Sequence, residues 1–83
     1  MCIIAVKEIG KPMFDDKTIK QMFRRNSDGA GIMWVENNKV HFKKGFMEVK
    51  PFLDFIHARR DWDVIPAVLH FRIGTAGGNT PLN

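Results

Sequence analysis

Three runs of apolar residues in this chain have the length and composition of buried β-strands. Residues 2–6 are mostly β-branched and apolar, and residues 30–35 and 66–73 are similar in character. Short runs of this kind, bounded by glycine, proline, asparagine or aspartate, are typical of buried strands, and the first two runs are apolar on both faces. We therefore predict strands at these three places.

A fourth strand is predicted from a different pattern. In residues 39–43, Val40 and Phe42 alternate with lysine and histidine side chains. Alternation with a period of two predicts a strand with one solvated face. Asn37 and Asn38 tolerate positive φ, which predicts a tight hairpin between this strand and the preceding one.

Two segments have helical periodicity. Asp15 or Asp16 can cap a helix that begins near Lys17 and ends with Arg25, and Pro51 suits the first turn of a second helix. The expected inner faces are Ile19, Met22 and Phe23 in the first helix and Phe52, Phe55 and Ile56 in the second.

The order strand–helix–strand–strand–helix–strand predicts a single α+β domain over residues 1–83, with residues 74–83 as a terminal loop. We expect a small, mainly antiparallel sheet with two helices on one face. Ile3 and Ala5 oppose Ile4 and Val6 by alternation, so both faces of the sheet are apolar. We expect the uncovered face to bind a second copy of the chain or another protein.

Composition narrows the class of protein. The chain has 45% hydrophobic residues, a net charge of +4 and no apolar stretch of transmembrane length or signal-peptide pattern, which predicts a cytoplasmic protein. One cysteine cannot form an internal disulfide, and the three histidines lack metal-ligand spacing. We expect neither a metal nor a cofactor.

Cys2 has two interpretations. In an apolar run, a lone cysteine is usually a small buried hydrophobe. However, removal of Met1 would leave Cys2 with a free α-amine, which titrates near pH 8. That amine could accept the thiol proton, so that one residue would supply both nucleophile and base.

Two further segments also allow a structural and a functional interpretation. The segment from His70 to Gly78 is either a strand end with a glycine-rich turn or a carboxylate site. In the second case the Arg72 guanidinium would bind the carboxylate in a bidentate manner beside Thr75. The segment from Arg25 to Ile32 is, taken alone, a helix end, a turn and a strand.

Together these segments resemble the class II glutamine amidotransferases, which are N-terminal-nucleophile hydrolases with short relatives in bacteriophages. The shared features are Met-Cys-Ile-Ile at the start, Arg25-x-x-Asp28-x-Ala30-Gly31-Ile32, and His70-x-Arg72-x-x-Thr75-x-Gly77, in that order. The resemblance extends over essentially the whole chain.

The resemblance implies a role for five residues. Cys2 would attack the side-chain amide of glutamine, Arg72 and Thr75 would hold the substrate, and Arg25 and Asp28 would organise the turn nearby. It also implies that the first and last strands pair at the centre of the sheet, so that Cys2 meets Arg72. The domain would be the first half of an αββα sandwich.

The sequence departs from the family pattern after Arg72. No Asn-Gly pair follows it to bind an oxyanion, and no acidic residue follows Asp63 to bind the substrate amine. Because one oxyanion donor is commonly worth about 10²–10³ in rate, we expect little glutaminase activity from this chain alone.

Two other functions remain open from the sequence. A phage-type protein could use the same scaffold to bind or inhibit a host protein. Alternatively, three basic pairs, with Trp34 and Trp62 nearby, could bind nucleic acid: Arg24-Arg25, Lys43-Lys44 and Arg59-Arg60.

Overall fold

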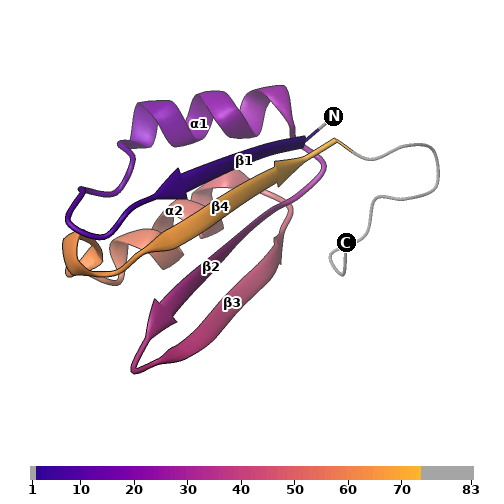
Figure 1. Cartoon of the computed structure of the whole chain (residues 1–83). Helices are drawn as coiled ribbons and strands as arrows, with labels where there is room; N and C mark the ends of the chain where they lie inside the picture. The colour runs from indigo at the N-terminus through magenta and orange to yellow at the C-terminus, as the bar shows by residue number, and fades with distance from the viewer. Residues whose placement is uncertain (1, 74–83) are drawn as a thin grey trace.

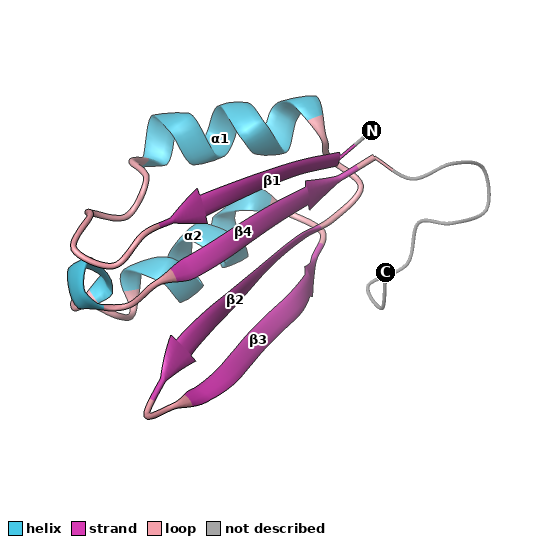
Figure 2. Cartoon of the chain, viewed as in Figure 1, coloured by secondary structure: helices cyan, strands magenta, loops and turns pink. Residues whose placement is uncertain are grey.

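The computed structural model describes residues 2–73, so the predicted loop 74–83, with Thr75 and Gly77, lies outside the described residues. Four strands and two helices follow one another in the order that the sequence predicts (Figures 1 and 2). In chain order they are β1 (Cys2–Lys7), α1 (Asp16–Arg25), β2 (Ala30–Glu36), β3 (Lys39–Phe46), α2 (Val49–His57), a 3₁₀ turn (Trp62–Val64) and β4 (Ala67–Arg72).

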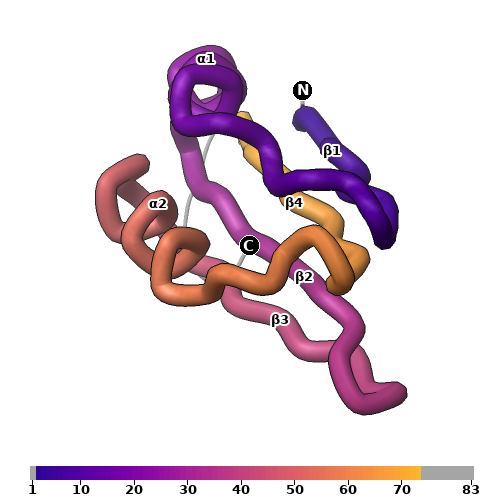
Figure 3. The backbone as a smooth tube through the Cα atoms, turned by 90° about the vertical axis from the view of Figure 1, so that its left-hand side faces the viewer, coloured from indigo at the N-terminus to yellow at the C-terminus, as the bar shows by residue number. Residues whose placement is uncertain are grey.

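The four strands form one antiparallel sheet in the order β1-β4-β2-β3. Both helices lie on the same side of it, and the opposite side has no helix among the described residues (Figure 3). This confirms the predicted α+β fold. The first and last strands do pair, but the expectation that they pair centrally is wrong for β1, which is an edge strand beside the central β4.

Local signals explain where α1 begins and ends. The Asp15 carboxylate accepts a hydrogen bond from the Thr18 backbone N–H at 2.8 Å, as an N-cap residue does. At the other end, the Asn26 N–H donates to the Met22 and Phe23 carbonyls. The buried residues of this helix are Ile19 and Phe23.

The helix α2 begins two residues before Pro51, so this proline lies in the first turn as predicted. Its buried side chains are Phe52, Leu53 and Ile56. Phe55, which was also predicted on the inner face, is half-buried and packs against this core, with its ring centroid 5.6 Å from that of Trp34 and the two rings tilted by 54°.

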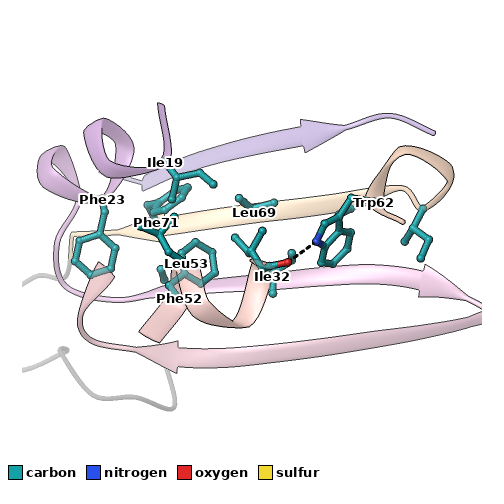
Figure 4. Packing of buried hydrophobic residues seen from close by; sticks show 12 residues of the cluster. Ile19, Phe23, Ile32, Phe52, Leu53, Trp62, Leu69 and Phe71 are labelled. Atoms are coloured by element: carbon teal, nitrogen blue, oxygen red, sulfur yellow. Dashed lines mark hydrogen bonds between the residues drawn. The ribbon is translucent and has the colours of Figure 1, made fainter. Parts of the chain in front are cut away.

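The core lies between the helices and the inner face of β4 (Figure 4). Leu69 and Phe71 of this strand have no solvent exposure. Phe71 makes edge-to-face contacts with Phe23 and Phe52, a favourable geometry for aromatic pairs. The Trp62 indole N–H donates to the Ile56 carbonyl at 2.8 Å, which satisfies a buried donor.

The hairpin between β2 and β3 is confirmed, with φ of 54° at Asn37 and 58° at Asn38. Val40 and Phe42 are exposed on the side away from the helices, while His41 stacks on Trp34 on the helix side. Alternation groups residues by face but does not say which face is covered, and here the pairing of β3 with β2 decides it.

Lys7 is a buried cation that sequence analysis did not anticipate. Its side chain points to the helix side of β1 and is 2% exposed. The ammonium donates to the carbonyls of Glu8 and Lys11 at 2.8 and 2.7 Å. Burial lowers the pKa of Lys7, and the Asp63 carboxylate partly opposes that shift.

Candidate functional site on the open face

Cys2 and Arg72 are direct cross-strand partners at one end of the sheet. Residues paired in this way point to the same face, with Cα atoms about 4.5–5.5 Å apart. Here that face is the one without helices, and Cys2 is exposed on it. The structure therefore brings together the two residues that the family resemblance implies are nucleophile and carboxylate ligand.

Backbone hydrogen bonds hold the turn before β2 at the same end of the sheet. The Asp28 N–H donates to the Arg72 carbonyl, and the Arg72 N–H donates to the Gly29 carbonyl, both at 2.8 Å. Gly29 has a φ of 146°, which side-chain-bearing residues rarely adopt. The backbone of Asp28 is thus held next to Arg72, whereas Arg25 is exposed in the last turn of α1.

On the same face, two residues before Arg72, His70 lies between its cross-strand partners Ile4 on β1 and Gly31 on β2. A Cβ atom added to Gly31 would collide with the His70 imidazole and lie 3.1 Å from the Lys44 Cβ. The ring therefore fills the space left by the missing glycine side chain. Desolvation, followed by the nearby Lys44 charge, lowers the pKa of His70, so the imidazole is neutral at pH 7.

The period of two places His70 and Arg72 on one face, so the sequence could group these two residues. It could not identify Gly31 as the neighbour that makes room for the imidazole, because that contact depends on how β4 pairs with β2. In the sequence, the only sign of this contact is a glycine within a predicted strand, which often marks a close approach of other atoms.

Apart from Lys44, the rest of this face is apolar. We call it the open face, defined by its outward side chains: Cys2, Ile4, Val6, Met33, Val35, Val40, Phe42, Lys44, Val68, His70 and Arg72. Its central row crosses all four strands through Val6, Val68, Met33 and Phe42. A shallow groove of about 600 Å³, lined also by Ile9 and Pro66, occupies the end far from Cys2.

On the helix side of the sheet, two of the residues that suggested nucleic-acid binding, Arg59 and Trp62, are engaged in contacts within the protein. The Arg59 guanidinium binds both carboxylate oxygens of Glu36, at 2.8 and 3.0 Å, and also contacts Asp61. This ion pair lowers the pKa of Glu36 and raises that of Arg59. Trp62 is 5% exposed beneath Arg59, so it offers no free face on which a base could stack.

Residues 2–73 contain no cluster of three or more histidine, cysteine or acidic side chains that could hold a metal ion. None of the helices in this range has the length and hydrophobicity needed to cross a bilayer. No protein-family model, curated protein or solved structure matches the chain. Its function is therefore inferred from its residues and from the geometry of the open face.

Proposed function

We propose that this chain is a glutamine amidotransferase-like domain of the N-terminal-nucleophile type. One observation supports the proposal above others: three segments far apart in the sequence meet at one end of the open face. They are the start of β1 with Cys2, the end of β4 with Arg72, and the turn at Asp28. These are the segments on which the family resemblance rests.

The neighbouring positions of Cys2 and Arg72 suit a glutamine substrate. Its carboxylate carbon and side-chain amide carbon are separated by four bonds, or about 5 Å. This is the scale of the separation between paired residues on adjacent strands. Arg72 can therefore bind the α-carboxylate with its guanidinium while the amide lies near the Cys2 sulfur.

The chemistry requires the α-amine of Cys2 and hence the removal of Met1. The amine accepts the thiol proton, and the sulfur attacks the amide carbon to form a C–S bond. The C–N bond then breaks, and ammonia leaves with the proton that the amine returns. Water hydrolyses the resulting thioester to glutamate and regenerates the thiol.

The 83 residues alone should perform this reaction poorly, for the reason already given: no Asn-Gly pair follows Arg72 and no carboxylate follows Asp63. The proposal is therefore best tested by binding and labelling rather than by turnover. Intact-mass measurement should first show loss of Met1, since a retained Met1 would rule out the N-terminal amine as base.

An electrophilic analogue of glutamine should then alkylate Cys2, and free glutamine should compete. Arg72→Ala should lose most of this labelling, while Arg24→Ala, which alters an exposed arginine on α1, should keep it. Iodoacetamide, which has no α-carboxylate, should label Cys2 equally in all variants. Equal labelling of the Arg72→Ala variant by the glutamine analogue would contradict the proposed site.

The open face supports a second candidate function, the binding of another protein, including a host protein if the chain is phage-encoded. Its exposed apolar side chains exceed what a monomeric surface usually carries. The two functions differ in the residues they need. Protein binding should persist in Cys2→Ser and be lost in Phe42→Asp. Covalent labelling by the glutamine analogue should instead be lost in Cys2→Ser and persist in Phe42→Asp.

A further inference from the structure

We infer that the open face is a self-association surface on which a second copy of this chain packs sheet against sheet. This inference does not depend on the chemistry of Cys2. It rests on the area, the composition and the charge distribution of the open face.

The exposed apolar area matches that of a standard interface. Six large hydrophobic residues of the open face, together with Ile9 at its rim, are between 42% (Val35) and 70% (Ile4) exposed. At roughly 150–200 Å² for a fully exposed residue of this size, they present about 700 Å². A standard protein–protein interface buries about 800 Å² on each partner.

The composition is that of a dimer interface core. The central row contains no charged side chain, and the row beyond it, which ends at Val35 and Val40, carries a charge only at its β1 end, at Glu8. Homodimer interfaces are depleted in charge at the centre and carry it at the rim. Two such sheets can pack about 10 Å apart and bury these rows against each other.

The rim charges indicate how the two copies are oriented. Lys44 lies on β3 near the Cys2 end, and Glu8 follows β1 at the other end, so the two occupy diagonally opposite corners. A two-fold axis can lie between the two sheets along the other diagonal, from the corner at Ile4 to the corner at Val40. Rotation about this axis places each Lys44 opposite the partner's Glu8. The strands of the two sheets then cross nearly at right angles, which is one of the two common sheet packings.

Val40 lies at the end of this axis, so it faces its own copy in the dimer. Val40→Asp would therefore place two carboxylates together in an apolar interface, where like charges cost several kcal/mol. Val64 in the 3₁₀ turn is a matched control, because it is 59% exposed, against 62% for Val40, and lies outside the open face.

Sedimentation equilibrium should give the wild-type chain twice its 9.5 kDa mass at micromolar concentration. Val40→Asp should weaken dimerisation about 100-fold or more, whereas Val64→Asp should leave it unchanged. Far-UV circular dichroism checks that both variants fold, and Phe42→Asp provides a second disruptive variant. A monomeric wild type, open-ended growth with concentration, or equal behaviour of the two valine variants would overturn the inference.

A charge exchange tests the orientation. Glu8→Lys should weaken the dimer by about 3–10-fold, because exposed ion pairs contribute little affinity but like charges repel. Adding Lys44→Glu to that variant should restore the wild-type dissociation constant. If the double variant is as weak as Glu8→Lys alone, the proposed axis is wrong.

Discussion

Gly31→Ala provides a sharp test of the structure around His70. Alanine normally stabilises a strand relative to glycine by about 0.5–1 kcal/mol, because it loses less backbone entropy on folding. Here the new Cβ atom would overlap the His70 imidazole and press on Lys44 Cβ at 3.1 Å. Overpacking of this kind costs about 1–3 kcal/mol. The clash outweighs the entropy gain, so we expect net destabilisation of about 0.5–2 kcal/mol.

The cost should shrink when the imidazole is removed. In a His70→Ala background only Lys44 Cβ, at 3.1 Å, still crowds the new Cβ atom, so Gly31→Ala should destabilise the fold much less than it does in the wild type. A double-mutant cycle then gives a coupling energy of about 1–3 kcal/mol.

Urea denaturation followed by tryptophan fluorescence at pH 7.5 and one protein concentration measures all four corners of the cycle. The contact with Lys44 Cβ is present in both backgrounds, so the difference between them isolates the contribution of the imidazole. If Gly31→Ala costs the same with and without His70, the imidazole does not occupy this space and the described packing is wrong.

Three further perturbations test the core and the open face. Leu69→Ala should cost about 2–5 kcal/mol in urea denaturation, because Leu69 has no solvent exposure, and a cost no larger than that of Val68→Ala would contradict the described core. Trp62→Phe should cost about 1–2 kcal/mol, since the Ile56 carbonyl loses its buried donor, and an unchanged denaturation midpoint would show that this bond contributes little. The lowered folded-state pKa of His70 means that the unfolded chain binds its proton more tightly, so stability should fall as pH drops below about 6.5. His70→Gln should remove that part of the pH dependence, and an identical pH profile in the variant would refute the assignment.

Local patterns in the sequence predicted the elements of this fold well. The capped start of α1 at Asp15, the Asn37-Asn38 turn and the apolar run of β1 are all encoded within a few residues. The α+β class follows from the order of such elements.

Properties that depend on strand pairing or on distant loops were predicted less well. The outward direction of Val40 and Phe42 follows from the register of β3 against β2. The burial of Lys7 follows from the carbonyls of Glu8 and Lys11, which only the folded loop places around its ammonium. Neither arrangement has a signal in hydrophobic periodicity, which reports on one element at a time.

In the candidate site, too, some features could be predicted from the sequence and others depend on how the strands pair. The resemblance to a known family placed Cys2 near Arg72, and the register of β1 with β4 makes them neighbours. Their roles stay predictions. The hydrogen bond from the Asp28 N–H to the Arg72 carbonyl could not be predicted from the sequence, because it depends on where the turn meets the end of β4.

The buried Lys7 ammonium gives this protein a built-in reporter of local opening. An acylating reagent needs a free, deprotonated amine, and Lys7 can offer one only when the segment at Glu8 and Lys11 releases its ammonium. The other lysines with described side chains are exposed and should be acylated at the rate of small amines. The acylation rate of Lys7 relative to theirs can be followed by peptide mass spectrometry. It therefore measures how often this end of β1 unfolds locally.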